Sequence, residues 1–372
     1  MIGRMHGPEQ VGPKRLWSRV IATQPLSMEA EAMNAKDPNT IACSMGIMAH
    51  NEERNIGQVL QRAISQRTAT VTLTEIIVVA SGCTDNTEAV VRRWAERDSR
   101  IRLLRQVRRQ GKASAVNQFL LEAREKVLVL CSADLVPEPD TIEQVVAPFA
   151  DPNIGMTTCR PVPLNDPRTF MGFAAHMLWD LHHHINLNGF KAGELIAFRK
   201  SFERIPYQTA VDEASIEPVI RGQGYGVRYI PTAIVHNKGP ETIADFLCQR
   251  RRIYAGHLAV REAVGYAVST MSGMKILGLV LRHLDWRPRP FLWTWAVAAL
   301  EAYGRLLGRR DYKEQRDHSI WEIATTTKEL DTACSVQRAT GTDYLLAYVA
   351  SSVAAKGREY GGHGRRGRTR PT

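Results

Sequence analysis

The sequence predicts an α/β fold, in which helices cover a mostly parallel, mixed sheet and a helical extension follows. Three observations lead to this prediction. Short apolar runs alternate with helical patterns through the first half of the chain. The chain has 372 residues, of which 44% are hydrophobic, and this is enough for a large buried core. Polar residues directly follow the apolar runs, where sheets of this kind bind their ligands.

The predicted elements follow one another in a regular order. Four strand-then-helix units come first: IACSMGIMA with NIGQVLQRAI, EIIVVA with TEAVVRRWAER, RIRLLRQ with SAVNQFLLEAR, and KVLVLCSA with TIEQVVAPFA. Three further strands, GMTTCRPV, ELIAFR and VRYIPTAIVH, alternate with the helical segments FMGFAAHMLWDLHHHI and DEASIEPVIRG and extend the sheet in mixed order. From Pro240 to about Gly308 the pattern is helical, with the apolar stripes GMKILGLVLRHL and PFLWTWAVAALEAYGRLLG.

Charge and composition narrow the classes of function that the protein can have. The 49 Lys and Arg against 38 Asp and Glu give a net charge of +11, which suits nucleic acid, an anionic membrane surface or an anionic substrate. Nucleic acid is disfavoured, because the basic residues are dispersed except in the tail and no nucleic-acid-binding signature occurs. The six cysteines are singly spaced, which indicates reduced thiols in a cytoplasmic protein. The sequence contains no apolar run of about 18 residues or more, so no membrane span is predicted.

Two polar motifs follow the first two predicted strands. In MAHNEERNIG, Asn51 can cap the next helix, and Glu52 complements the positive end of that helix. In VVASGCTDNT, small residues such as Ser81 let the backbone approach a ligand, and Asp85 can cap the next helix. Each motif alone is typical of an ordinary turn.

Two more motifs follow the third and fourth strands. RRQGKASAVNQFL is not a phosphate-binding P-loop, because Gln106 stands where that pattern requires its first glycine. Its basic group of Arg108, Arg109 and Lys112 suits a phosphate or a solvated surface equally. In VLVLCSADLVPEP, Asp134 comes directly after a strand that should be buried, at the edge where ligands gather. Beside a diphosphate, this carboxylate is enough to hold a hard divalent cation.

The four motifs, in this order, resemble glycosyltransferase family 2, whose nucleotide-binding fold is called GT-A. The residues that match the family pattern are Asn51, Glu52 and Glu53, then Gly82, Thr84, Asp85 and Thr87, then Gly111, Lys112, Ala115 and Asn117, then Ala133 and Asp134. Ala80 and Ser81 depart from it, because they stand where the family commonly has the aspartate pair that contacts the nucleoside. Ser132 replaces the first aspartate of D-x-D. The resemblance implies a donor site made by Asn51, Glu52, Ser81, Asp85, Lys112 and Ala133, with Asp134 on a Mg²⁺ or Mn²⁺ ion.

The resemblance continues downstream. GELIAFR is similar to the acceptor-side glycine strand of the family and brings in Gly193. VDEASIEPVIRGQGY is similar to an acidic pair before a Gly-aromatic turn, which implies Glu213 as the general base, with Asp212 beside it. An inverting transfer needs one base for the acceptor hydroxyl, and a carboxylate serves. Without the resemblance, the pair would be interpreted as charges at a helix start.

The segment KGPETIADFLCQRRRI resembles the Q-x-x-R-W segment of polysaccharide synthases of this family. Gln249 and Arg252 match, and they would contact the acceptor and the diphosphate, whereas Ile253 replaces the tryptophan. The implied function is transfer of a sugar from a nucleotide-diphosphate sugar to a glycan or lipid-linked acceptor. The alternative is a catalytically silent sugar-nucleotide-binding protein. A nucleotidyltransferase is disfavoured, because no early G-G-x-G-T-R loop occurs.

The predicted organisation has four segments. Residues 1–40 are a poorly ordered start, and 41–239 form the GT-A domain, with a nucleotide half (41–150) and an acceptor half (151–239). Residues 240–330 form a helical region, and 331–372 a helix with a basic tail. The group of Trp286, Trp293 and Trp295 is typical of either a core or a membrane interface. We expect Trp293 and Trp295 to be exposed and the protein to attach peripherally to the cytoplasmic face of an anionic membrane.

Overall fold

The structure is a computed structural model that describes residues 40–318, 320 and 330. All helices and strands below belong to the unit formed by residues 1–329. The predictions for residues 1–39 and 331–372 lie outside the described residues.

One eight-stranded sheet forms the centre of the fold, in the order β3-β2-β1-β4-β7-β6-β8-β5. Its strands are β1 (Ile41–Ala49), β2 (Val71–Ser81), β3 (Ile101–Gln106), β4 (Val127–Ser132), β5 (Leu135–Pro137), β6 (Ile154–Pro163), β7 (Ile196–Arg199) and β8 (Gly226–Asn237). Strands β1 to β4 are mutually parallel, as predicted. Strand β7 is antiparallel to β4 and β6, so the second half of the sheet has mixed order. The short β5, which pairs with β8, was not predicted.

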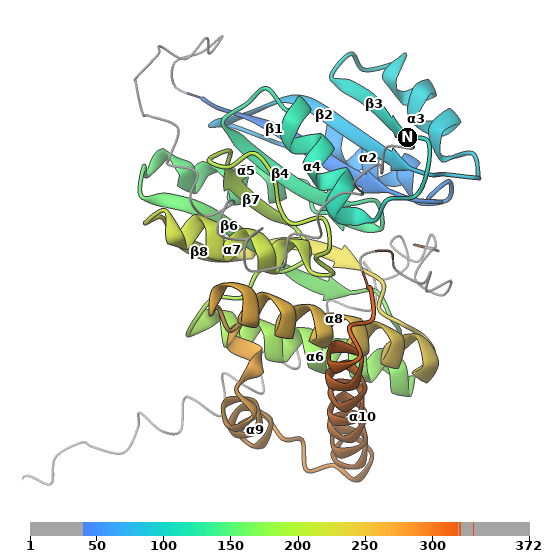
Figure 1. Ribbon diagram of the computed structural model, residues 1–372, viewed down its shortest axis with the longest axis vertical. Helices are drawn as coiled ribbons and strands as arrows, with labels where there is room; N and C mark the ends of the chain where they lie inside the picture. Colours follow the sequence, from blue (N-terminus) through green and yellow to red (C-terminus); the bar gives the residue numbers. More distant parts are fainter. Residues whose placement is uncertain (1–39, 319, 321–329, 331–372) are drawn as a thin grey trace, which may run out of the picture. The chain divides into compact units, whose positions relative to one another are not determined.

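Nine helices are described around this sheet. They are α2 (Ile56–Ile64), α3 (Thr87–Ala95), α4 (Lys112–Glu122), α5 (Thr141–Val146), α6 (Phe170–Leu187), α7 (Asp212–Gly222), α8 (Ile243–Val264), α9 (Gly273–Arg282) and α10 (Pro288–Lys313). Figure 1 shows α6 and α8 beyond one end of the sheet, with α9 and α10 farther out. Helix α10 packs along α8 and also contacts α6.

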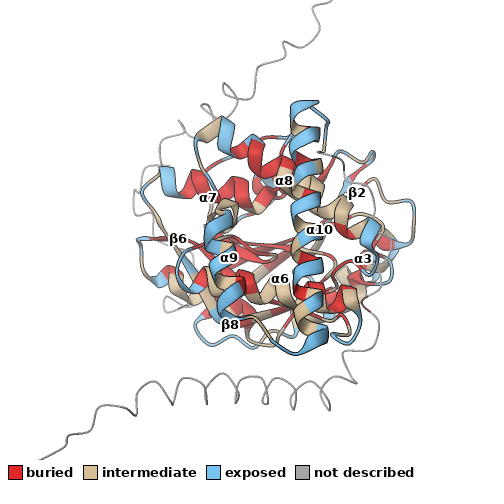
Figure 2. Ribbon diagram, turned by 90° about the horizontal axis from the view of Figure 1, so that it is seen from below, coloured by how far each residue is buried: buried red, intermediate tan, exposed pale blue. Residues whose placement is uncertain are grey.

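Both faces of the sheet are buried. Along β2, Ile76 and Val78 lie in one apolar cluster with α2 and α5, whereas Ile77 and Val79 lie in a second cluster with α4 and α7. Alternate residues of a strand point to opposite faces, so a strand covered on both sides has an uninterrupted apolar sequence. Figure 2 shows this buried centre and the exposed surface of α9 and α10. The segment EIIVVA is therefore a buried strand, which confirms the strand predicted there.

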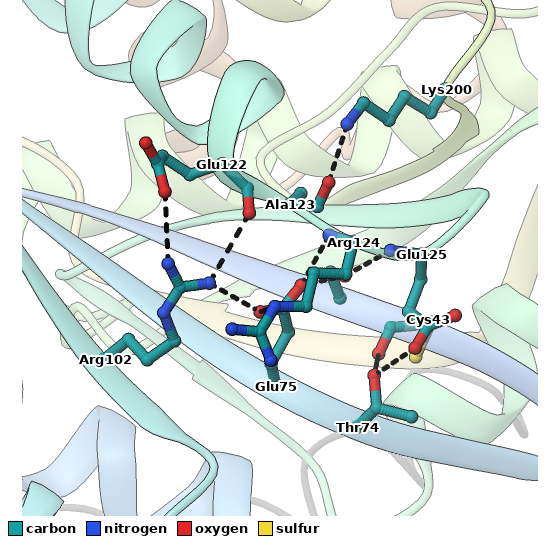
Figure 3. A network of polar contacts seen from close by, with 10 residues as sticks. Cys43, Thr74, Glu75, Arg102, Glu122, Ala123, Arg124, Glu125 and Lys200 are labelled. Carbon is teal, nitrogen blue, oxygen red and sulfur yellow. Dashed lines mark hydrogen bonds and ion pairs between the residues drawn. The ribbon is translucent and has the colours of Figure 1, made fainter.

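A polar network fixes the sheet far from the predicted site (Figure 3). The buried Glu75 accepts hydrogen bonds from Ser44 Oγ (2.7 Å), Arg102 Nη1 (2.9 Å) and Arg124 N (2.7 Å). Burial opposes its ionisation, but these bonds outweigh burial and hold the pKa of Glu75 below its usual value. Six residues separate Glu75 from Ser81, or about 20 Å of strand. Glu75 therefore stabilises the sheet and takes no part in the site.

Candidate active site

Side-chain hydrogen bonds join the two loops that follow β1 and β2. Asn51 Oδ1 accepts from Thr84 N (2.8 Å), and Asn51 Nδ2 donates to Thr84 Oγ1 (3.1 Å). Asn51 has φ 52°, in the left-handed region that asparagine tolerates. Helix α2 begins at Ile56, directly after Asn55. The prediction that Asn51 caps this helix is therefore wrong, because Asn51 links the two loops instead.

The acidic residues of these loops also have protein partners. Asp85 accepts from Glu53 N (3.1 Å) and from Thr87 N and Oγ1 (3.0 and 2.6 Å). Burial opposes the ionisation of Asp85, but these bonds outweigh it and lower its pKa. Glu52 is buried and accepts from Asn55 Nδ2 (2.9 Å). Both carboxylates shape the loops, and the prediction that Glu52 and Asp85 bind the donor remains a prediction.

A third loop closes against the end of β2. Gln110 N donates to Ser81 Oγ (3.4 Å). Gly82 has φ 58°, and a Cβ there would lie 2.3 Å from Arg109 N. Glycine is required at this position because both the backbone angle and the space exclude a side chain. Three of the predicted motifs thus meet at one edge of the sheet.

Lys112 joins this edge to the acceptor half. Its Nζ lies 2.7 Å from Glu213 Oε1 and 3.4 Å from Asp212 Oδ2. Lys112 is the first residue of α4, and the two acids are the first residues of α7. The Lys112 side chain is 12% exposed and that of Glu213 19% exposed, whereas Asp212 is fully buried. Glu213 is therefore the member of the acidic pair that a substrate can reach.

The charges of this group act strongly on one another. Burial raises the pKa of Asp212 to about 6, with Lys112 opposing the shift and Glu213 adding to it. Burial alone would lower the pKa of Lys112, but Glu213 and Asp212 outweigh it and raise that pKa. Lys112 therefore stays charged near neutral pH. The prediction that it binds the donor remains a prediction, because its ammonium is already paired with acids.

A further carboxylate, Glu194, lies at the same place. Burial raises its pKa to about 7, with the charges of Asp134 and Glu213 adding to the effect, while Lys112 and Arg252 oppose it. The side chain of Asn237 lies 3.4 Å from Glu194 Oε1. The structure thus brings together four carboxylates, at 134, 194, 212 and 213, with the two cations at 112 and 252.

This donor set fits a hard divalent cation. Asp134 and Glu194 are close enough for one charge to oppose the other, and a cation between them would relieve that repulsion. No group of three or more His, Cys, Asp or Glu side chains that could hold a metal occurs among residues 40–318. An ion here would complete its shell with diphosphate and water oxygens, as Mg²⁺ commonly does.

The QRRRI segment lies on α8. Gln249 and Arg252 are three residues apart and therefore share a face of the helix. Burial lowers the pKa of Arg252 to about 10, while Asp212, Glu213 and Glu194 oppose the shift. The guanidinium thus lies within the field of the carboxylate group, and the prediction that it binds the diphosphate remains a prediction.

The remaining predicted residues act through their backbone. Ala133 is buried, and its N–H donates to Met48 O (3.1 Å), which holds the turn that carries Asp134. Gly193 N donates to Thr158 Oγ1 (2.9 Å), next to Glu194.

The structure brings two residues to the site that the sequence did not assign, Glu194 and Asn117. In the sequence, Glu194 is an ordinary charged residue at the start of a predicted strand. The only signal near it is the preceding glycine of GELIAFR. Asn117 belongs to a motif but had no assigned task. Its Nδ2 donates to Ile205 O (2.9 Å), and its Oδ1 accepts from Ile205 N (2.7 Å). It therefore ties α4 to the segment that leads into α7 and holds Lys112 beside the acidic pair.

No helix in the described part of the chain is long and apolar enough to cross a membrane. Trp293 is half-buried: it packs edge-on against Phe170 and Phe173, and Arg289 lies over its ring at 4.2 Å. The expectation that Trp293 is exposed is therefore wrong. Trp286 and Trp295 are 78% and 39% exposed.

Comparison with known proteins gives partial matches in sequence. A dolichyl-phosphate beta-glucosyltransferase of Trichomonas vaginalis is 30% identical over 113 residues, which cover 29% of this chain and 34% of that protein. A second such enzyme of the same organism is 34% identical over 103 residues, covering 26% and 32%. The chain thus spans about a third of the length of the curated relatives it matches.

The fold has a match over most of the chain. A mannosyltransferase from Pyrobaculum calidifontis, solved with GDP-Man and Mn²⁺, superposes with a TM-score of 0.54 and 20% identity, covering 82% of this chain and 95% of that one. At this identity the likeness concerns the fold, which is GT-A. Residues 44–217 match the family described as Glycosyl transferase family 2. Since this segment holds both the loops that follow β1 to β4 and the acidic pair of α7, residues 44–217 of the chain belong to glycosyl transferase family 2.

Proposed function

We propose that this chain is an inverting glycosyltransferase that moves a sugar from a nucleotide-diphosphate sugar to a hydroxyl of a glycan or lipid-linked acceptor. The observation that carries the proposal is the meeting of Glu213, Lys112 and Asp212 at the edge of the sheet. A protein that only bound a sugar nucleotide would need no such group on its acceptor side.

Glu213 is the proposed general base. Its carboxylate is reachable, and the contact with Lys112 holds it in one orientation. As the acceptor oxygen attacks the sugar carbon, its proton passes to the free oxygen of this carboxylate. Asp212, fully buried on the other side of Lys112, positions the ammonium. The bond from sugar to diphosphate then breaks with inversion at the sugar carbon.

Arg252 and Gln249 are proposed to bind the diphosphate from α8. A guanidinium offers paired N–H donors to phosphate oxygens and stabilises the charge of the departing diphosphate. A Mg²⁺ or Mn²⁺ ion held by Asp134 and Glu194 would supply further charge neutralisation there. The loops carrying Asn51, Glu52, Ser81 and Asp85, with the backbone at Ala133, would receive the nucleoside.

A lipid-linked acceptor fits the exposed surface of the last helices. The apolar side chains exposed on α9 and α10 are Met274, Leu277, Leu281, Leu292, Trp295, Tyr303 and Leu306. Exposed cations flank them at Lys275, Arg282, Arg309 and Arg310. Apolar area beside positive charge is the combination that binds an anionic bilayer surface. The names of the sequence relatives, which act on dolichyl phosphate, favour the same location.

The full-length protein tests the proposal directly. We expect release of nucleoside diphosphate from one member of a panel of nucleotide sugars with Mn²⁺ or Mg²⁺, faster when a lipid-linked or glycan acceptor is present. NMR of the product should show the anomeric configuration opposite to that of the donor. Tight donor binding with neither hydrolysis nor transfer would favour the silent binding protein instead.

A further inference from the structure

A second group of charged side chains lies outside the proposed transfer site. It lines a cavity of about 80 Å³ between α6, α8 and α10. Its charged and imidazole side chains are His182 from α6, Lys191 from the loop after it, Arg250 and His257 from α8, and Glu301 and Arg305 from α10, and Tyr254 and Thr270 also line it. At roughly 30 Å³ per water, the space equals two to three waters, about the size of one tetrahedral oxyanion.

The helices aim these side chains at one point. Arg250 and His257 are seven residues apart, two turns of α8, and so share a face. Glu301 and Arg305 are four apart on α10 and pair at 2.9 Å. Arg250 Nε lies 3.7 Å from Glu301 Oε2. Glu301 therefore already serves two cations.

The cavity carries more positive than negative charge. Lys191, Arg250 and Arg305 face the single carboxylate of Glu301, and the two histidines are neutral. Burial lowers the pKa of Lys191 to about 8, with Arg250 adding to the shift. Water could satisfy hydrogen bonds here, but it would leave the excess charge of these partly buried cations without a counter-ion. The surplus calls for an anion.

His257 gives an independent indication of a ligand. Its side chain is buried, with 7% exposed, and it lines the cavity. Neither of its ring nitrogens has a hydrogen-bond partner among the described residues, and the same holds for Arg250 Nε. Buried polar groups normally have partners, so these atoms point to a bound group with several acceptor oxygens.

From this geometry we infer a phosphate pocket, formed by Lys191, Arg250, Arg305 and His257, that takes a phosphomonoester group carried by the acceptor. The guanidinium and ammonium groups donate to the phosphate oxygens, and His257 donates through one ring nitrogen. That the phosphate belongs to an acceptor rests on the proposed function, whereas phosphate binding in the pocket does not depend on it.

The surroundings of the pocket suit such an acceptor. Arg250 is adjacent on α8 to Gln249, and the charge of Glu194 acts on Lys191, so the pocket neighbours the transfer site. Apolar residues complete its lining, among them Leu178, Ile185 and Met271. The phosphate belongs either to a lipid headgroup or to a small soluble molecule, and both present the same group.

Calorimetry on the full chain tests the pocket without any turnover. We expect inorganic phosphate and glycerol phosphate to bind, and Arg250→Gln and Arg305→Gln each to weaken binding at least tenfold. Arg261→Gln, at an exposed cation on the same helix as Arg250, is the matched control and should bind as the parent does. Because Arg305 also contacts Glu301, His257→Phe provides a second variant that removes donors without touching a charge pair.

Vesicles distinguish the two sources. Phosphatidic acid has a terminal phosphomonoester and phosphatidylglycerol does not. If the protein prefers vesicles with phosphatidic acid and Arg250→Gln abolishes this preference, the ligand is a lipid headgroup. If the protein binds inorganic phosphate but binds both kinds of vesicle with equal affinity, the ligand is a soluble molecule. Absence of phosphate binding in every experiment, or an equal loss of phosphate binding in Arg261→Gln, overturns the pocket. Failure of sugar transfer with phosphate binding intact contradicts only the proposed function.

Discussion

Lys112 Nζ lies 2.7 Å from Glu213 Oε1, although 101 residues separate the two in the chain. One residue opens α4 in the nucleotide half and the other stands at the start of α7 in the acceptor half. The contact lies where transfer is proposed, and it makes Lys112 a positioning residue for the proposed base.

Replacing Lys112 by Met should lower transfer about a hundredfold or more. Without the ammonium, the Asp212 and Glu213 carboxylates repel each other, and one of them takes up a proton near neutral pH. The measurement is kcat for sugar transfer, together with the pH profile, whose acid limb should move to higher pH. Lys126→Met, at an exposed lysine, is the control and should leave both unchanged.

Glu213→Gln should abolish base catalysis while donor binding persists. The amide keeps the size of the side chain but cannot accept the proton, so kcat should fall about a hundredfold or more with little change in donor affinity. Asp212→Asn should be milder, because Asp212 only positions Lys112. A larger effect of Asp212→Asn would assign the base to Asp212.

Asp134→Asn should remove activation by Mn²⁺ or Mg²⁺. The variant keeps the shape of the turn but loses a hard oxygen ligand, so the metal concentration needed for half-maximal activity should rise at least tenfold. Titration of activity with Mn²⁺ measures this. Glu96→Gln, at an exposed acid, should behave as the parent. An unchanged metal dependence in Asp134→Asn would remove this residue from the metal site.

His182 should make the protein sensitive to mild acid. Burial, with Lys191 nearby, lowers its pKa to about 3, so the folded state holds it neutral whereas the unfolded chain protonates it below about 6.5. Its contribution to stability is present above pH 6.5 and is lost as the pH falls toward 3. Between pH 6.5 and 5 the loss is about 2 kcal/mol. Urea unfolding of His182→Gln at both pH values should show a smaller difference than the parent.

Exposed residues of α10 should control attachment to membranes. Flotation with anionic liposomes should capture the protein at low salt and release it at high salt, since each Lys or Arg near the surface adds about 1 kcal/mol. Trp295→Ser and Leu292→Ser should weaken capture. Tyr207→Ser, at an exposed aromatic in the loop before α7, should not. Absence of capture at low salt would leave these helices without a role at a bilayer.

The sequence predicts the parts of this protein whose structure is local. Alternation of apolar runs locates β1 to β4 and their helices, and the acidic pair of α7 was identified through the resemblance to the family. Glu194 could not be found that way, because its burial depends on β7 entering the sheet antiparallel between β4 and β6. Asparagine commonly caps helices, yet Asn51 bonds to Thr84, which comes from a distant loop. Contacts across the sheet decide both cases.

Gly304 and Gly308 mark where α10 lies against α8. A Cβ at 304 would come 2.8 Å from Arg250 Cβ, and one at 308 would come 2.5 Å from Arg251 O. These close approaches fix the rotation of α10 about its own axis. A one-residue insertion between 296 and 300 would turn Glu301 and Arg305 by about 100° relative to the N-terminal part of the helix. The length of this helix is therefore constrained at its centre, where an insertion would separate the residues that pack on α8 from those before them.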